Sequence, residues 1–423
     1  MNTFFQKFAL LLQDAQLRSR LLFVLSVLAI FRLLAAIPIP GINAAQLQQF
    51  FNNNQFFGLL NLFSGGGLSN LSIVLLGVGP YITASIIMQL LTIMVPRLKQ
   101  LYQEEGEAGR QKFSQYSRLI TLPIAVVQGI GFLLLLQREL VLPALSPFQF
   151  GVNVLVVTAG SVLLMWLGEL ISEFGLGNGV SLLIFAGIVA RLPRSASQLL
   201  FSFDTTQLPV YIAFVIAAVA VVAAVVVVTE AERPVPVTYA KRIRGMKVYG
   251  GQSTYLPLRL NQAGVIPIIF ALSFLLLPQM FATFFQTSSH YWLAATSTFI
   301  LHWLQNLGFY GSVYFVLVVL FTYFYTAVTF DPHAIAENLQ KNGAFIPGVR
   351  PGGSTEEYLA KVITRITLVG ALFLGAIAVM PIIVQSLSGI QSLALGGTAL
   401  LIVVSVILDL ARRVDAQISI REY

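Results

Sequence analysis

Long apolar runs separated by short polar segments dominate the chain. An α-helix needs about 20 mostly apolar residues to cross the hydrocarbon core of a bilayer, and ten windows of roughly this kind can be placed. They cover approximately residues 20–37, 71–95, 117–136, 151–170, 179–193, 208–229, 262–279, 311–330, 364–386 and 396–411. The pattern therefore predicts an all-α, multi-pass membrane protein with ten transmembrane helices.

Composition supports this interpretation. The chain is 57% hydrophobic and 10% charged, with a mean hydropathy of +0.83, whereas an average soluble domain carries about 25% charged residues. The first apolar run follows basic residues, as in a signal peptide, but further spans follow it. We interpret this run as a retained first helix.

Two apolar stretches are too short to span. Residues 56–71 contain a short helical piece followed by three glycines. This stretch is either a helix on the membrane surface or a re-entrant segment, since non-helical backbone at membrane depth must be buried in protein or line a cavity. Residues 291–307 place Trp292 and Trp303 on either side of an apolar middle, which is typical of a helix at the outer interface.

Basic residues indicate the orientation. Most of the 25 lysines and arginines fall in segments that the ten spans place on one face, including the long segments 229–260 and 331–361. The other face has only Arg138, Arg191 and Arg194. Because cytoplasmic loops carry the excess of Lys and Arg, we expect both termini and both long segments in the cytoplasm.

Two short patterns occur twice. Residues 77–85, "GVGPYITAS", share G-V-x-P-x-I-x-A with residues 264–273, "GVIPIIFALS". Residues 179–185, "GVSLLIF", share G-x-x-L-L-I with residues 397–403, "GTALLIV". The matches pair span two with seven and span five with ten, as a duplication of five spans predicts. Because five is odd, the halves 1–207 and 208–423 have opposite orientations, and such inverted repeats place function between the halves.

The repeat pairs Ile82 with Ile269 and Ile184 with Ile402. At 1.5 Å per residue all four fall near mid-bilayer. Each one alone is compatible with ordinary core packing or contact with lipid. Arranged together around a shared axis, they would form a hydrophobic constriction that opposes the passage of water and ions.

Pro80 and Pro267 occupy matched positions in the repeat. A proline inside a helix removes one backbone hydrogen bond. We interpret both as weak points within transmembrane helices, either sites where the helix bends or static kinks.

The sequence shows no pattern for catalysis. It contains no G-x-x-x-x-G-K-[ST] phosphate loop and no cysteine, and its three histidines do not form a ligand pattern. We expect no enzyme activity, no metal and no cofactor. Secondary transporters, the alternative class, place ionisable residues near mid-membrane, but here Arg32, Glu169 and Asp409 lie near span ends. A structural scaffold explains neither the paired prolines nor the long, shaped loops.

Nine stretches occur in the order of a known family. They are "IPIPGI" (37–42), "FSGGGLS" (63–69), "GPYITASIIMQLL" (79–91), "EGEAGRQKFSQYSR" (105–118), "GLGNGVSLLIFAGIV" (175–189), "YAKR" (239–242), "QSTYLPLRLNQAGVIP" (252–267), "NGAFIPGVRPG" (342–352) and "GGTALLIVV" (396–404). From about Leu17 to its C-terminus the chain resembles the SecY family of protein-conducting channels, in its bacterial or organellar form.

The resemblance implies two halves of five helices that close like a clamshell around a central pore. It implies a lateral gate to lipid between helices two and three on one side and seven and eight on the other. The implied pore ring is Val78, Ile82, Ile86, Val180, Ile184, Ile269 and Ile402. The implied plug is residues 56–70, with Leu59, Leu60, Phe63, Ser64, Gly65, Gly66, Gly67 and Leu68. The implied gate residues, which from the sequence alone are more typical of helix-to-helix hydrogen bonding, are Thr83, Gln128 and Asn261.

The two long segments are the expected docking surface. In "FIPGVRPGGST" the Pro and Gly residues specify a shaped loop with Arg350 at its tip, and a second basic cluster that could meet ribosomal RNA phosphates is Lys241, Arg242, Arg244 and Lys247. The resemblance implies the ATPase SecA or the ribosome as driving partner, the small subunits SecE and SecG, and signal peptides and unfolded preproteins as substrates. It also implies release of hydrophobic helices into the lipid bilayer. We expect the bacterial plasma membrane, and a thylakoid membrane also fits.

Overall fold

The computed structural model describes residues 14–39, 67, 71–103, 105–138, 142, 143, 145–190, 193, 197, 208–239, 242–244, 247–249, 253–286, 290–388 and 391–421. These residues are mostly helical, and helices cover all or part of each of the ten predicted segments. In order, the helices are α2 (Ala15–Ala36), α5 (Gly79–Met94), α7 (Gly106–Arg138), α8 (Pro147–Phe174), α9 (Gly179–Val189), α11 (Leu208–Glu230), α12 (Ile266–Phe285), α14 (Leu307–Thr329), α16 (Gly353–Ser388) and α17 (Gln391–Arg421). Three further helices are α6 (Pro96–Gln103), α13 (Tyr291–Gln305) and α15 (Pro332–Lys341).

Among the described residues, five helices are by themselves long and apolar enough to cross a membrane, namely α2, α7, α8, α14 and α16. Helices α5 and α6 form a sixth candidate as a pair bent by 112°. Helix α9 is apolar but has only 11 residues. The fold is therefore that of a membrane protein with several apolar helices.

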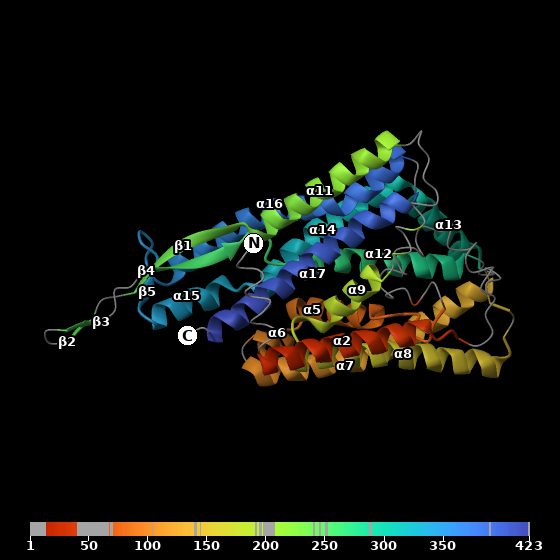
Figure 1. Ribbon diagram of the computed structural model, residues 1–423, viewed down its shortest axis with the longest axis horizontal. Coiled ribbons are helices and arrows are strands. Elements are labelled where there is room, and N and C mark those ends of the chain that lie inside the picture. The colour runs from red at the N-terminus through yellow and green to blue at the C-terminus, as the bar shows by residue number, and fades with distance from the viewer. Residues whose placement is uncertain are drawn as a thin grey trace.

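The helices form two groups that follow the chain order. In Figure 1, α2, α5, α7 and α8 lie in the lower part of the view and α11, α14 and α16 in the upper part, while α9 of the first group and α12 and α17 of the second lie between them. Contacts join the groups where α12 packs against α5 and α7, and where α17 packs against α9. The hydrophobic core extends across this junction.

The fold is not wholly helical, and the expectation of an all-α protein is wrong on this point. An antiparallel sheet of order β4-β1-β5 contains β1 (Glu232–Tyr239), β4 (Ser253–Arg259) and β5 (Ala344–Phe345). Val235 and Val237 of β1 are buried, with an exposed proline between them. This alternation is the strand period, but Pro234 and Pro236 disguise it, since proline is depleted in strands. Beside these prolines β1 is paired only with β4.

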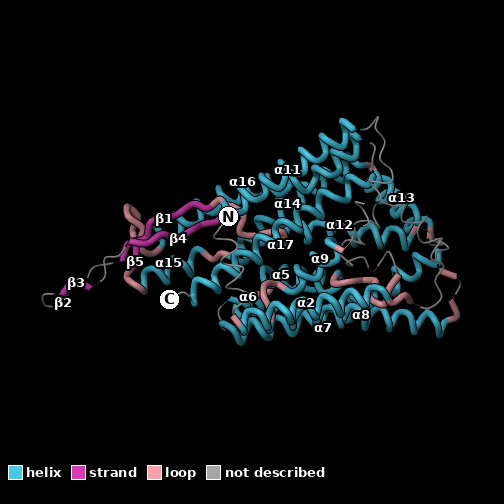
Figure 2. The backbone as a smooth tube through the Cα atoms, in the orientation of Figure 1, coloured by secondary structure: helices cyan, strands magenta, loops and turns pink. Residues whose placement is uncertain are grey.

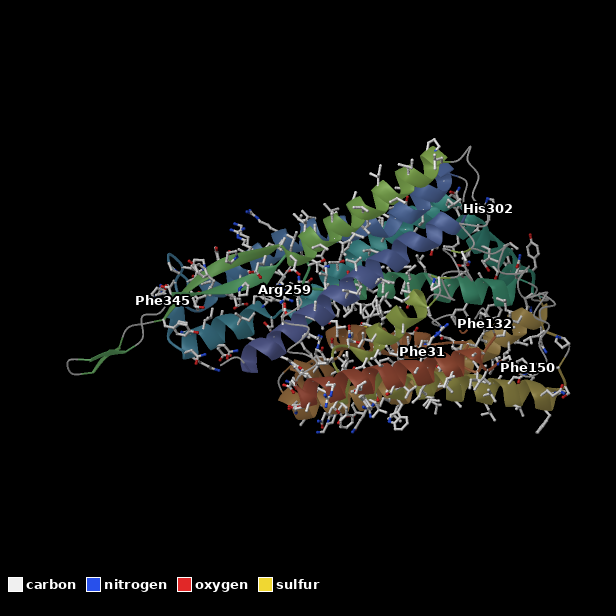
Figure 3. All side chains as sticks on the ribbon, viewed as in Figure 1. Phe31, Phe132, Phe150, Arg259, His302 and Phe345 are labelled. Carbon is white, nitrogen blue, oxygen red and sulfur yellow. The ribbon has the colours of Figure 1, made fainter. Side chains whose placement is uncertain are left out.

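The sheet joins the two long segments predicted to face the cytoplasm. Its buried residues pack with Leu359, Val362 and Ile363 of α16, so both segments belong to one small core. Figure 2 shows the strands (magenta) gathered at one end of the molecule. Figure 3 labels Phe345 on β5 and His302 on α13 at opposite ends of the helices. This placement agrees with the prediction that the long loops and α13 lie on opposite faces of the membrane.

Candidate functional site

The residues of the predicted pore ring lie in, or pack against, one hydrophobic cluster. Six of them are no more than 5% exposed, and they come from both groups of helices: Val78, Ile82, Ile86, Ile184, Ile269 and Ile402. Val180 is partly buried and packs against the same cluster. The structure thus brings together the residues that the repeat and the resemblance singled out. Their role as a ring stays a prediction, because the cluster also contains many other core residues.

Helix geometry explains how one element supplies three of these side chains. Val78, Ile82 and Ile86 follow one another at four-residue spacing, which places them on one face of α5 and its N-cap. Helix α5 contacts α12, which carries Ile269, and α9 contacts α17, which carries Ile402. The ring residues therefore lie where the two groups of helices meet.

The interpretation of Pro80 and Pro267 as weak points within helices is wrong. Each proline stands in the first turn of its helix, after an N-cap valine with φ −90° and ψ 4° in α5 and φ −94° and ψ −6° in α12. The backbone N–H groups of a first turn have no intrahelical partner, so proline there breaks no hydrogen bond. Both prolines mark where a helix begins, and the predicted span 71–95 divides into a turn segment and α5.

We call residues 71–78 and 260–265 the lead-in segments. In each of them a glycine has the left-handed conformation, with φ 59° at Gly77 and 61° at Gly264, which glycine adopts at little cost. A side chain satisfies each glycine carbonyl: Ser161 Oγ of α8 donates to Gly77 (2.9 Å), and Asn261 Nδ2 donates to Gly264 (3.3 Å). The resemblance between the two stretches therefore extends from sequence to backbone.

The second pair of repeats matches less closely in local structure. Gly179 begins α9 after the N-cap Asn178, whereas Gly397 lies inside α17, which begins at Gln391. Ile184 and Ile402 are nevertheless both 1% exposed in the shared cluster.

Two predicted gate residues lie on α5 and α7, which contact each other and α12, and the third, Asn261, lies in the lead-in segment before α12. Thr83 of α5 is buried, and its Oγ1 donates to the carbonyl of Gly79 (3.0 Å). Gln128 of α7 is half-buried. Asn261 is buried, and its Oδ1 has no hydrogen-bond partner among the described residues. The hydrogen bonds of Thr83 to Gly79 and of Asn261 to Gly264 remain within their own segments, so these bonds do not tie neighbouring helices together.

Most of the predicted plug lies outside the described residues. This applies to Leu59, Leu60, Phe63, Ser64, Gly65, Gly66 and Leu68. Gly67 is described and buried, and its carbonyl accepts a hydrogen bond from the backbone N–H of Ser72 (2.8 Å). The choice between a surface helix and a re-entrant segment for residues 56–71 is therefore not decided by the described part of the chain.

The predicted docking residues lie at the sheet end of the molecule. Arg242, Arg244 and Lys247 belong to β2 (Arg242–Arg244) and β3 (Lys247–Tyr249), a two-stranded ribbon in which Arg244 stands opposite Lys247; Figure 2 shows the ribbon projecting beyond the larger sheet. Lys241 lies outside the described residues. Arg350 is exposed after β5, and its carbonyl accepts a hydrogen bond from Thr355 Oγ1 (3.0 Å).

Two features near these sites were missed by the sequence analysis. Ser161 in α8 bonds the lead-in segment 71–78; its only sequence signal is its place among small residues, which allow close helix packing in membranes. His333 Nδ1 of α15 lies 2.9 Å from Glu356 Oε2 of α16. The hydrogen bond and the negative charge of Glu356 raise the pKa of His333.

Comparison with known proteins agrees with the fold and the motifs. The SecY family model matches residues 72–411. The chain is 42% identical to the protein translocase subunit SecY of Mycobacterium leprae, with 97% of each chain covered. It is 45% identical to the same subunit of Thermus thermophilus, with 97% of this chain and 95% of the relative covered.

Solved structures share the fold at lower identity. One is described as a protein conducting channel, with a TM-score of 0.63, 18% identity, and coverage of 93% of this chain and 91% of that chain. Another is Sec61 in the canine ribosome-channel complex, with a TM-score of 0.61, 18% identity and the same coverage. The relatives, the family model and the fold agree: the chain belongs to the SecY family.

Proposed function

We propose that this protein is the channel subunit of a protein translocase. Unfolded secretory chains cross through its centre, and hydrophobic helices leave sideways into lipid. The relatives at 42% and 45% identity carry the name of a translocase subunit, and a structure with the same fold is a protein conducting channel. The observation that carries the proposal is the burial of six predicted ring residues in one cluster where the two groups of helices meet, with the seventh, Val180, packed against it.

The proposed architecture is ten transmembrane helices in two inverted halves, 1–207 and 208–423, closed like a clamshell. Three observations support it. Helices cover all or part of each predicted segment, the two groups in Figure 1 follow the chain order, and Gly77 and Gly264 adopt the same backbone conformation before matched helices.

In this proposal the ring of Val78, Ile82, Ile86, Val180, Ile184, Ile269 and Ile402 is the seal. Aliphatic side chains offer water no hydrogen bonds, so a narrow ring of them excludes water and ions. Because packing rather than hydrogen bonds holds these aliphatic side chains, a polypeptide can push them aside without breaking a hydrogen bond between them. Residues 56–70 act as the plug that fills the outer funnel beside the seal.

The lateral gate runs between α5 and α7 on one side and α12 and α14 on the other, with Thr83, Gln128 and Asn261 along it. The contacts of α12 with both α5 and α7 support a closed gate. The hydrogen bonds of Thr83 and Asn261 within their own segments mean that separating these helices breaks neither bond.

Energy for transport comes from partners, which we propose to be the ATPase SecA and the ribosome. They bind the sheet and the basic residues Lys241, Arg242, Arg244, Lys247 and Arg350, while SecE and SecG are the small membrane subunits. No cofactor takes part. The matches to translocase subunits do not support the alternative of a secondary transporter, nor an enzyme.

The proposed location is the bacterial plasma membrane with both termini in the cytoplasm, and a thylakoid membrane is the alternative. Bacterial relatives and the placement of basic residues in the sheet and loops support this. The opposite ends occupied by Phe345 and His302 agree with it.

A photocrosslinker tests the proposal. It is placed at Ile82 or Ile402 in the assembled complex, and a stalled secretory precursor is presented. We expect crosslinks to the precursor from both positions and none from Leu155 of α8, which is 69% exposed on the outside of the helices. A complex that assembles but gives no crosslink at Ile82 or Ile402 would refute the channel.

A further inference from the structure

Two glycines from different halves make the same close contact with backbone. A Cβ atom built on Gly160 of α8 would overlap the carbonyl oxygen of Ile73 and lie 2.8 Å from its carbonyl carbon. A Cβ atom built on Gly370 of α16 would lie 2.5 Å from the carbonyl oxygen of Leu260 and 3.4 Å from its carbonyl carbon. Real Cβ atoms do not approach oxygen this closely, and a backbone carbonyl cannot rotate away as a side chain does. Each position therefore requires glycine as long as the neighbouring segment stays in place.

The two contacts occupy equivalent points of the repeat. Ile73 precedes the left-handed Gly77 by four residues, and Leu260 precedes the left-handed Gly264 by the same distance. The next nearest atom is also the same, the Cα of the residue after the carbonyl. The sequence patterns matched only spans two with seven and five with ten. This contact adds a match of span four with span nine, which a duplication of five spans requires.

Each contact lies directly before a helix that carries ring residues. Lead-in segment 71–78 continues into α5, with Ile82, and lead-in segment 260–265 continues into α12, with Ile269. Segment 71–78 is held firmly: Leu71, Val74 and Leu75 are at most 1% exposed, and Ser161, next to Gly160, donates its hydrogen bond to Gly77. The position of each lead-in segment sets where the following helix starts, and hence the depth of its isoleucine.

We infer that Gly160 and Gly370 are positioning residues for the channel seal. Helices α8 and α16 supply no ring side chain, but each seats one ring-carrying helix through a contact that only glycine permits. The inference rests on the proposed function. It adds that closure depends on two buried contacts outside the pore.

The test compares Gly160→Ala and Gly370→Ala with alanine at two roomier glycines. The control in the first half is Gly129→Ala on α7, where the Cβ would lie 3.8 Å from Thr158 Oγ1 and 3.9 Å from Leu76 Cδ1. The control in the second half is Gly311→Ala on α14, where the nearest atom, Val379 Cγ1, is 3.4 Å away. All four complexes are reconstituted in vesicles, and the resting flux of a small anion is measured.

Both test variants should raise the resting flux at least roughly fivefold, the lower end of what overpacking does to a two-state equilibrium. The closed state needs the isoleucines at matched depth, whereas an open state does not, so displacing a lead-in segment penalises closure selectively. The same variants should accept a precursor with a defective signal sequence. Gly129→Ala and Gly311→Ala should behave as the parent does. Parent-like flux in both test variants overturns the inference.

A second measurement separates positioning from a general loss of packing. Because the chain has no cysteine, Ile82→Cys combined with Ile269→Cys reports disulfide formation across the seal without background. Adding Gly160→Ala or Gly370→Ala should lower the disulfide yield at a temperature where the complex is still fully assembled. An unchanged yield refutes positioning even if thermal stability falls.

If Gly160→Ala and Gly370→Ala fail to accumulate in the membrane, Ser161→Ala provides a second test. It removes the hydrogen bond to Gly77 without adding volume. Its control is Thr158→Val on the same helix, since the Thr158 hydroxyl has no hydrogen-bond partner among the described residues. Ser161→Ala should raise the flux and Thr158→Val should not; equal flux contradicts the inference. If instead the parent complex gives no crosslink from Ile82 to a precursor, the proposed function fails, and the two failures are thereby distinguished.

Discussion

The seal proposed at the centre of the molecule makes a quantitative prediction for Ile82→Asn and Ile269→Asn. Both isoleucines are 5% exposed in the shared cluster. They come from matched places in the two halves. Asparagine is smaller and carries an amide that the surrounding aliphatic side chains cannot satisfy.

The magnitude follows from burial. Burying one isoleucine side chain is worth about 1.5 to 3 kcal/mol, and an unpaired buried amide costs about 1 to 3 kcal/mol. If the open channel exposes both sites to water, each substitution disfavours the closed state by about 2.5 to 6 kcal/mol. Since about 1.4 kcal/mol is a tenfold change, this corresponds to a shift of roughly two to four powers of ten in the closed-to-open ratio.

The assay is resting ion conductance of the reconstituted complex, together with export of precursors that have defective signal sequences. Ile82→Leu keeps the apolar volume and costs less than about 1.5 kcal/mol, so it should change the closed-to-open ratio by about tenfold at most. Both asparagine variants should conduct ions at rest and select signal sequences less strictly. Parent-like conductance and selection in both asparagine variants would refute the seal.

Three further predictions concern the sheet end of the molecule. Leu359→Ala, in the core beneath the sheet, should destabilise this core by about 2 to 5 kcal/mol and lower the protection of the sheet amides against hydrogen exchange. Glu357→Ala, on the exposed face of the same helix, should leave this protection unchanged. Glu356 raises the pKa of His333, so the bond between α15 and α16 contributes its full stability below the ordinary histidine pKa and loses it as pH rises through the raised pKa. Glu356→Gln should lower the pKa of His333 in an NMR titration, and an unchanged pKa would contradict the assignment. Arg244→Gln should weaken ribosome binding and reduce the slope of log affinity against log salt by about one; an unchanged slope would exclude a phosphate contact.

The sequence located the helices but misjudged where some of them begin. The apolar window 364–386 starts well after the N-terminus of α16, which runs from Gly353 to Ser388, because a helix continues through polar residues once it leaves lipid. Helix α7 likewise begins at Gly106, before the predicted 117. The strands were missed because prolines alternate with the buried valines of β1, and proline lowers the expectation of a strand.

The roles of the candidate site residues stay predictions, but their burial and backbone setting can be compared with what the sequence indicated. Side-chain type and the repeat were enough to select residues that the structure buries together, such as Ile82 and Ile269. The prolines were misread because their effect depends on whether they stand inside a helix or in its first turn, and an apolar run does not reveal that boundary. The contacts of Gly160 and Gly370 join residues 87 and 110 positions apart along the chain, so only the folded backbone shows them.

The small sheet has a mechanical consequence. Strand β4 ends at Arg259, and the next residue, Leu260, meets Gly370 of α16. The same helix, one turn earlier at Ile366, belongs to the core beneath the sheet. The sheet, α16 and the start of α12 are therefore connected by direct contacts over a short stretch of chain. A partner that moves the sheet would displace the start of α12, the proposed gate helix, both through residues 260–265 and through the contact of Leu260 with α16.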